Sequence, residues 1–269
     1  MVFALDTVII FLILGIVVGF FAGLLGIGGG GIMVPVLTAY FLYKDVPVEY
    51  VVHLALGTSM ASIIVTSAAS LYAHHQHQGI LWNVVKAMVP GVLIGTFIAT
   101  YLAAQISSQS LAIFFAIFMT YVSIQMFLNV QAKASRTIPD STGLFSAGAG
   151  IGAVSAIVAI GGGSLTVPFL TWHNVNIKKA IGSSAAVGFP IAIAGTIGYL
   201  INGWSVAYQT EYLFGFVYLP AVLLISLMSY FTAPLGAKLA HKLPVPTLKK
   251  VFALFLLALG LKMLHSVIW

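Results

Sequence analysis

The chain has 269 residues, of which 61% are hydrophobic and 6% are charged. With a mean hydropathy of +1.11, it is far more apolar than a soluble globular domain, so we exclude that class and expect several membrane-spanning segments. The sequence contains no cysteine, which excludes a disulfide framework, a thiolate metal site and a cysteine nucleophile. We attribute the formal net charge of +6 to loops on the positive side of a membrane and predict no nucleic-acid partner.

Eight apolar segments have about the length needed to cross a bilayer. They cover residues 7–25, 53–73, 82–104 and 110–129 in the first half of the chain, and residues 142–160, 179–201, 212–239 and 247–268 in the second half. Asp6 precedes the first segment in place of a basic region, so we expect a retained membrane helix and not a signal peptide. Two further apolar segments, residues 32–43 and 165–172, are too short to span as helices. We predict that they form half-helices or re-entrant arms.

A glycine-rich motif precedes each of these two short segments. Residues 26–35 read GIGGGGIMVP and residues 159–168 read AIGGGSLTVP. Consecutive glycines adopt positive φ angles at little cost and do not continue an ordinary helix, so each motif predicts a break in a membrane helix. Because backbone at membrane depth must be buried or line a polar cavity, the two breaks are the first candidates for a binding site. Tight helix packing or a hinge is the alternative interpretation.

The glycine motif is the first of three anchors that recur in the same order along the chain. The other two are ALGTS at residues 55–59 with AIGSS at residues 180–184, and PGVL at residues 90–93 with PAVL at residues 220–223. Such duplications are common in transporters, whose substrate binds between the halves. We therefore predict two repeats, residues 1–130 and 142–269, joined by a cytoplasmic linker over residues 131–141.

The number of crossings predicts how the two repeats are oriented. If each glycine-broken pair enters and leaves on one side, three spanning helices remain in each half, and this odd number inverts the second half. The inverted arrangement leaves only Lys44 and Lys262 off the lysine-rich side, which the positive-inside rule places in the cytoplasm. We therefore predict an all-α membrane protein with two inverted repeats and both termini outside. Whether the short arms cross fully stays open, because a hairpin that crosses twice has the same parity.

The chemistry available at the breaks is that of neutral dipoles. No Asp, Glu or Arg lies near a predicted midplane, which argues against a carboxylate proton relay. Consecutive backbone N–H groups with a helix N-terminus behind them attract anions. We predict that the N–H donors belong to Gly28, Gly29, Gly30, Gly161, Gly162 and Gly163. The hydroxyls predicted to assist them are those of Thr58, Ser59, Ser183 and Ser184, with close helix packing as the alternative.

Two cationic side chains stand near the hydroxyl pairs. His53 lies five residues before Thr58, and Lys178 lies five residues before Ser183. We expect them at the two mouths of the site, on opposite membrane faces, as groups that collect anions, with His53 also able to carry a proton. The alternative is that both are interfacial caps.

Two further motifs are weak matches. The spacing Gly26-x-Gly28-x-x-Gly31 follows a membrane helix and not the strand of a βαβ unit, so we predict no dinucleotide site. His74, His75 and His77 form a short tract at the end of a predicted span. We interpret this tract as interfacial and predict no metal site.

Together these motifs resemble those of the TauE/SafE family of sulfite exporters. The resemblance rests on GxxxGLLGIGGGGIMVP at residues 19–35, on its echo at residues 159–168 and on the two hydroxyl-bearing anchors, and it covers nearly the whole chain. It implies transport of small sulfur-containing anions, such as sulfite, sulfoacetate or related sulfonates, across a prokaryotic plasma membrane. Ala159 and Ser164 stand where the first motif has Gly26 and Gly31, so the two half-sites are expected to be unequal.

We therefore predict a secondary transporter that moves a small anion by alternating access, without a cofactor. Its predicted partners are the anion and the lipid bilayer, and a homo-oligomer is left open. An anion channel is the alternative within transport. An intramembrane enzyme is disfavoured because neither hydroxyl pair has a histidine predicted at the same depth to act as a base. A structural scaffold is a third alternative, and it predicts assembly defects without any flux.

Overall fold

The computed structural model describes residues 5–25, 28–128, 135–205, 211–240 and 245–269, without the side chains of residues 25 and 237–249. Gly26 of the first motif, and residues 131–134 of the predicted linker, lie outside the described residues. The described helices are α1 (Leu5–Leu25), α2 (Gly30–Tyr43), α3 (Val48–Gln76), α4 (Trp82–Gln105), α5 (Ser108–Phe127), α6 (Ser141–Val158), α7 (Gly163–Trp172), α8 (Ile177–Gly203), α9 (Leu219–Ala240) and α10 (Val245–Ile268).

The prediction of a polytopic all-α protein is confirmed. Eight of the described helices are long and apolar enough to cross a membrane, namely α1, α3, α4, α5, α6, α8, α9 and α10. The other two, α2 and α7, have 14 and 10 residues. At about 1.5 Å per residue they are roughly 21 and 15 Å long, which is less than the roughly 30 Å of a hydrocarbon core.

One predicted boundary is wrong. The apolar segment predicted to begin at residue 212 starts as a helix only at Leu219, because the strands β1 (Leu213–Phe214) and β2 (Val217–Tyr218) form an antiparallel hairpin before it. Gly215 turns this hairpin with a positive φ of 54°. Apolar residues in a short hairpin extend the hydropathy signal of the following helix, so composition alone does not separate the two.

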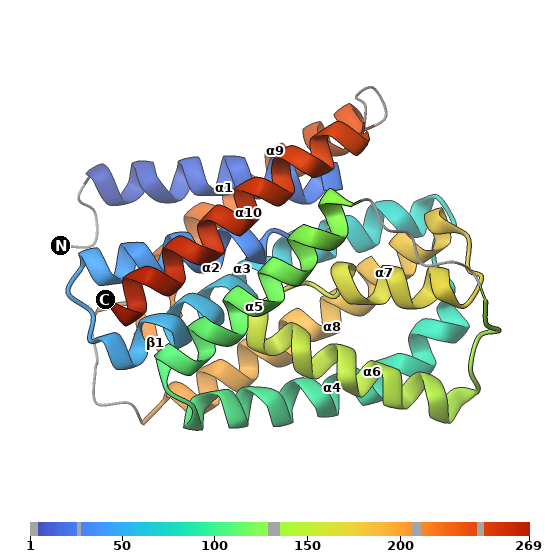
Figure 1. The fold of residues 1–269 in the computed structure, drawn as a ribbon, viewed down its shortest axis with the longest axis horizontal. Helices are drawn as coiled ribbons and strands as arrows, with labels where there is room; N and C mark the ends of the chain where they lie inside the picture. The colour runs from blue at the N-terminus through green and yellow to red at the C-terminus, as the bar shows by residue number, and fades with distance from the viewer. Residues whose placement is uncertain (1–4, 26–27, 129–134, 206–210, 241–244) are drawn as a thin grey trace.

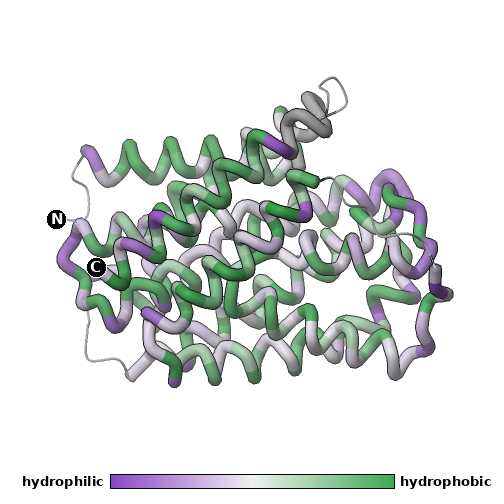
Figure 2. The backbone as a smooth tube through the Cα atoms, in the orientation of Figure 1, coloured by the Kyte–Doolittle hydropathy of each residue, from purple (hydrophilic) through white to green (hydrophobic). Residues whose placement is uncertain are grey.

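The helices run along the long axis of the molecule, and their surfaces are apolar. Figure 2 shows hydrophobic residues along the lengths of the helices and hydrophilic residues gathered at the two ends of the bundle. Large apolar side chains face outward on several helices, among them Ile13, Ile94, Ile117 and Leu223. An apolar surface of this extent requires lipid around it. The chain is therefore a multi-pass membrane protein.

The two helix hairpins next to the glycine motifs open toward opposite ends of the bundle (Figure 1). The first, α1 with α2, opens at the end where both termini lie, and there the Tyr40 hydroxyl lies 3.2 Å from Thr7 Oγ1. The second, α6 with α7, opens at the end where residues 135–140 lead into α6. There the backbone N–H groups of Ser135 and Arg136 donate to the carbonyl oxygen of Trp172, at 3.2 and 3.3 Å. We call these the terminal end and the linker end.

The main helix contacts join the two halves of the chain. The helix α1 packs on α9, α4 packs on α6, α3 packs on α8, and α5 packs on α10. Of the eight spans, α3 and α8 are the most buried: 83% and 61% of their apolar windows are inside the protein, against at most 44% in the other six. Exchanging α1 with α6, α3 with α8, α4 with α9 and α5 with α10 leaves this set of contacts unchanged. The two halves therefore surround a shared centre built on α3 and α8.

Glycines allow two of these helix pairs to approach closely. On α1, a Cβ atom at Gly15, Gly19 or Gly23 would collide with the backbone of α9. On α4, Gly91 and Gly95 lie in the same way against carbonyl oxygens of α6. Glycine at four-residue spacing lets membrane helices pack backbone against backbone. These glycines serve packing between the helices.

Candidate functional site

The two glycine motifs adopt matching backbone conformations. Gly29 and Gly162, the residues just before α2 and α7, are left-handed, with φ of 77° and ψ of −13° and −17°. The carbonyl of each accepts the N–H groups three and four residues further on, at 2.8–3.2 Å. Glycine adopts this conformation at little cost because it has no Cβ atom. The glycines therefore start each short helix inside the bundle after a sharp turn.

The two breaks touch each other. A Cβ atom on Gly28 would lie 3.0 Å from the backbone N of Gly161, and one on Gly30 would collide with the carbonyl oxygen of Ala159. The breaks are thus in direct backbone contact, with α2 leading from them to the terminal end and α7 to the linker end (Figure 1). Both helix N-termini, which carry partial positive charge, start at this contact. The six glycines of the predicted site are brought together.

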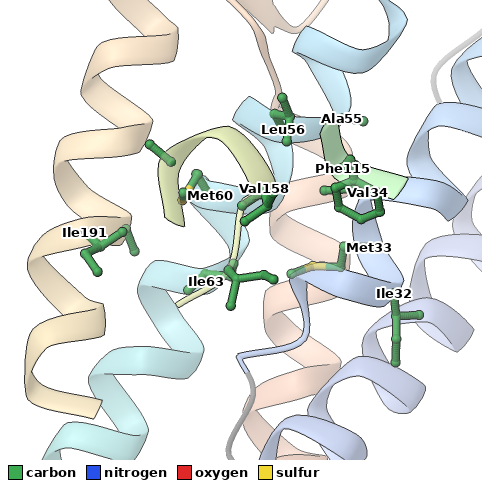
Figure 3. Packing of buried hydrophobic residues seen from close by; sticks show 14 of the residues in the cluster. Ile32, Met33, Val34, Ala55, Leu56, Met60, Ile63, Phe115, Val158 and Ile191 are labelled. Carbon is green, nitrogen blue, oxygen red and sulfur yellow. The ribbon is translucent and has the colours of Figure 1, made fainter. Parts of the chain in front are cut away.

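Apolar side chains surround this contact. Figure 3 shows Met60 and Ile63 of α3 beside Val158, at the end of α6, with Ile191 of α8 nearby. A Cβ atom on Gly161 would lie 3.4 Å from Ile63 Cγ2, and one on Gly162 would lie 3.0 Å from Ile191 Cδ1. The breaks are therefore packed between α3 and α8.

Two of the predicted hydroxyls hold loops of the opposite half. Thr58 Oγ1 accepts the backbone N–H of Tyr218 at 3.0 Å, and Ser183 Oγ accepts that of Leu81 at 2.9 Å. We call these contacts, each with its preceding glycine, the α3 joint and the α8 joint.

The glycines beside these hydroxyls complete the match. Gly57 lies against the carbonyl oxygen of Phe216, and Gly182 lies against that of Gly79. In each joint the glycine contacts a carbonyl oxygen, and the hydroxyl accepts the N–H group two residues later in the chain. These backbone groups precede α9 in the α3 joint and precede α4 in the α8 joint. Burial and the neighbouring Tyr40 raise the pKa of the Tyr218 phenol to about 12.

The two hydroxyl pairs lie at separate places. Gly57 is level with Tyr199 of α8, since a Cβ atom on Gly57 would lie 3.1 Å from Tyr199 Cβ. Sixteen residues of α8 separate Tyr199 from Ser183, which is about 24 Å along the helix. No single site therefore contains all four predicted hydroxyls. Ser59 and Ser184 are buried beside the joints, and Ser59 Oγ has no partner among the described residues.

His53 lies in a buried polar contact and not in an open vestibule. Only 4% of it is exposed. Its Nε2 donates to the carbonyl oxygens of Ala103 and Ile106, at 3.0 and 3.1 Å, and its Nδ1 lies 3.2 Å from Ser108 Oγ. The ring caps the C-terminus of α4, as the alternative interpretation of an interfacial cap expects, and a vestibule role of His53 stays a prediction. Lys178 is exposed at the start of α8, at the linker end.

A cavity that the sequence did not reveal runs along α7. It has a volume of about 540 Å³. Its lining residues come from α5, from the residues before α6 and from α7: Tyr121, Gln125, Ser135, Ser164, Leu165, Pro168, Phe169 and Trp172. The one sequence signal of this cavity was Ser164, which stands in the second motif where the first motif has Gly31. Within the described chain no cluster of three His, Asp or Glu side chains could hold a metal ion.

Comparison with known proteins agrees with this architecture. Residues 11–263 match the family model described as sulfite exporter TauE/SafE. A probable membrane transporter protein of Haemophilus influenzae is 40% identical over 258 residues, covering 95% of this chain and 97% of that protein. A probable membrane transporter protein of Methanocaldococcus jannaschii is 28% identical, with 94% of each chain covered. YunE of Bacillus subtilis, a probable membrane transporter protein, is 25% identical, with 96% of this chain and 97% of YunE covered.

No solved structure matches the chain. The family match spans nearly all of the residues that form the bundle, including both glycine breaks and both joints. The chain therefore belongs to the sulfite exporter TauE/SafE family and is a multi-pass membrane transporter.

Proposed function

We propose that this protein is a secondary transporter that moves a small sulfur-containing anion across the plasma membrane of a prokaryote by alternating access. Candidate substrates are sulfite, sulfoacetate and other organosulfonates. The observation that carries the proposal is the contact between the two glycine breaks, from which the N-termini of α2 and α7 both start. Backbone N–H groups at two helix N-termini bind an anion without a fixed cation, and such a site can release its substrate more readily.

Two inverted repeats, residues 1–130 and 142–269, suit this mechanism. The exchange of the halves preserves the main helix contacts, and the two hairpins open toward opposite ends. The proposed cytoplasmic side is the linker end, where Arg136 and Lys178 lie, while Glu49 lies at the terminal end. Both termini are then outside. Transporters with such repeats alternate by rocking one half against the other around a central site.

The proposed substrate donors are the backbone N–H groups of Gly28, Gly29, Gly30, Gly161 and Gly163, whereas the N–H group of Gly162 already donates to the carbonyl oxygen of Ile160 at 2.7 Å. Ser59 and Ser184 lie beside separate joints, so each assists from its own side of the breaks. Ser59 Oγ is buried without a partner among the described residues, so its hydroxyl is available to a substrate. Thr58 and Ser183 already accept backbone N–H groups but keep one proton each to donate. Lys178 remains a proposed vestibule cation because it is exposed at the linker end.

The proposal is tested with purified protein and an anion panel. Sulfite, sulfate, thiosulfate, sulfoacetate and simple carboxylates are compared by thermal shift, and the stabilising anions are then tested by counterflow in proteoliposomes. We expect selective stabilisation by a sulfur oxyanion or sulfonate, and saturable counterflow of the same anion. Current that does not saturate would indicate a channel, and stabilisation by no sulfur-containing anion would remove the support for this substrate class.

A further inference from the structure

The packing of the two short helices breaks the symmetry between the halves. The helix α2 packs against α10, whereas the corresponding packing of α7 on α5 is nearly absent among the described residues. The cavity of about 540 Å³ occupies this unpacked position, between α5 and α7 at the linker end. Alternating access requires that a transporter built from two equivalent halves is closed on one side and open on the other. Here the position between α2 and α10 is filled, and the position between α7 and α5 is open.

The residues at the two equivalent positions show how one gap is closed. A Cβ atom on Gly31, in the first turn of α2, would lie 3.1 Å from Leu256 Cδ2 of α10 and 3.3 Å from Met119 Sδ of α5. Its counterpart Ser164, in the first turn of α7, lines the cavity. The first break is thus covered by side chains, and the second is open toward the linker end.

The inner end of the cavity offers unused hydrogen-bond donors. The N–H groups of Gly163 and Ser164 start α7 and have no acceptor among the described residues, as expected for the first turn of a helix. Ser164 Oγ and Thr166 Oγ1 are buried and also lack partners there, and Thr166 is 0% exposed. Thr166 Oγ1 lies 3.5 Å from the Cβ position of Gly162, beside the helix start. Buried hydroxyls are rarely left without a partner, and Ser164 also lines the cavity, so its hydroxyl can donate to a ligand there.

The walls of the cavity determine the kind of ligand. Leu165, Pro168 and Phe169 line it from α7, and Tyr121 lines it from α5. Its volume lies within the range of about 300–1,000 Å³ that is typical of small-molecule sites. Apolar and aromatic walls favour a carbon skeleton over the hydration shell of a bare oxyanion. The pattern of donors at one end and apolar walls beyond fits an organic anion with a short chain.

A cation stands at the outer end of the cavity. The guanidinium group of Arg136 lies 4.2 Å from the centroid of the Trp172 ring, and Trp172 Nε1 donates to Ser135 Oγ at 2.9 Å. The cation–π contact holds Arg136 beside two lining residues. A fixed positive charge at the mouth raises the local concentration of anions.

We propose that the cavity between α5 and α7 is an inward-facing binding site for an organic anion with a short carbon skeleton, whose charged group binds at the start of α7. Ser164, which lines the cavity, donates to that group together with the N–H groups at the start of α7, and Arg136 guides it in from the linker end. The inference rests on the proposed transport function and deepens it by naming the substrate class.

The natural absence of cysteine allows a direct test with Leu165→Cys. The variant is reconstituted in liposomes and treated from either side with a charged, membrane-impermeant methanethiosulfonate. We expect modification from the linker side only, with protection by propane-1-sulfonate or propionate at lower concentrations than by sulfite or sulfate. The two organic anions separate a preference for sulfonate from one for carboxylate. Gln76→Cys, exposed at the linker end of α3 and outside the cavity lining, is the control that the reagent should label and that no anion should protect.

Further substitutions in the same background test the donors. Ser164→Ala should raise the half-protecting concentration about tenfold, whereas Thr171→Val should not, because that hydroxyl donates to Val167 within α7 at 3.0 Å. A thermal midpoint within the range of the parent protein shows that each variant folds.

The result that overturns the inference differs from the one that overturns the proposed function. One such result is saturable sulfite counterflow together with Leu165→Cys labelling that organic anions do not reduce. It would show that the cavity is not the binding site, while the proposed transport function would stand. Labelling only by a membrane-permeant reagent would show a lipid-facing groove and have the same consequence. Absence of saturable flux for every anion in the panel would refute the proposed function itself.

Discussion

The substitution Gly182→Ala tests whether the α8 joint holds the two halves together. The added Cβ atom would collide with the carbonyl oxygen of Gly79 and would lie 2.8 Å from its carbonyl carbon. These atoms belong to the backbone, so no side chain can rotate away and the loop before α4 must shift. The shift would also stretch the 2.9 Å hydrogen bond from Leu81 N to Ser183 Oγ.

The expected magnitude follows from three effects. Overpacking a well-packed site costs about 1–3 kcal/mol, and weakening one buried hydrogen bond costs about 0.5–1.5 kcal/mol. Replacing glycine by alanine within a helix returns about 1 kcal/mol. The net loss is about 0.5–3.5 kcal/mol. For a chain of this size roughly 2–4 °C correspond to 1 kcal/mol, so the melting temperature should fall by about 1–14 °C.

The assay is thermal unfolding of the purified protein in lipid nanodiscs, followed by intrinsic fluorescence. Gly57→Ala, which meets the carbonyl oxygen of Phe216 at the α3 joint, should cause a fall of the same size. Gly150→Ala is the matched control: it also lies in a membrane helix, but no atom lies within 4 Å of its Cβ position, so stability should not fall. Equal melting temperatures for Gly182→Ala and Gly150→Ala would refute the role of the joint.

Three other predictions follow from the same contacts. Thr58→Ala and Ser183→Ala should each lower the unfolding free energy by about 1 kcal/mol, as measured by denaturant titration. The loss should be the same with and without anion, and a loss seen only with anion would instead indicate substrate contact. Gly30→Ala should abolish proteoliposome flux, because its Cβ atom would collide with the Ala159 carbonyl, and wild-type flux would contradict this. His53→Phe should cost about 1–3 kcal/mol by leaving buried carbonyls unpaired, with an unchanged pH profile of transport; a shifted profile would show that His53 carries a proton.

Local sequence patterns were sufficient for the membrane helices and the breaks. A span is recognised from about twenty consecutive apolar residues, and a glycine run disrupts a helix wherever it stands. Both signals lie within a few residues, so the eight spans, the short arms and the left-handed turns at Gly29 and Gly162 were predictable. The hairpin at residues 213–218 was missed because its apolar residues continue the signal of α9.

The roles of the polar side chains were not predictable in this way. Thr58 and Tyr218 are 160 residues apart in sequence, Ser183 and Leu81 are 102 apart, and His53 and Ala103 are 50 apart. The repeat showed that Thr58 and Ser183 are equivalent, and the structure agrees that they make equivalent contacts. The atoms that they contact belong to loops of the opposite half, and no local sequence pattern indicates which loop will lie beside which hydroxyl.

The sequence by itself determined the membrane character, the helical class, the number of spans and the positions of the two breaks, because each depends on hydropathy or backbone freedom over a short window. Only the tertiary structure decided that the breaks touch, that the hydroxyl anchors act as joints, and that α2 packs against α10 while a cavity opens beside α7. Those features depend on how α5 and α10 pack on opposite sides of one centre. Gly31 and Ser164, at matching positions of the two glycine motifs, have different surroundings there, and this difference arises only once both halves are folded together.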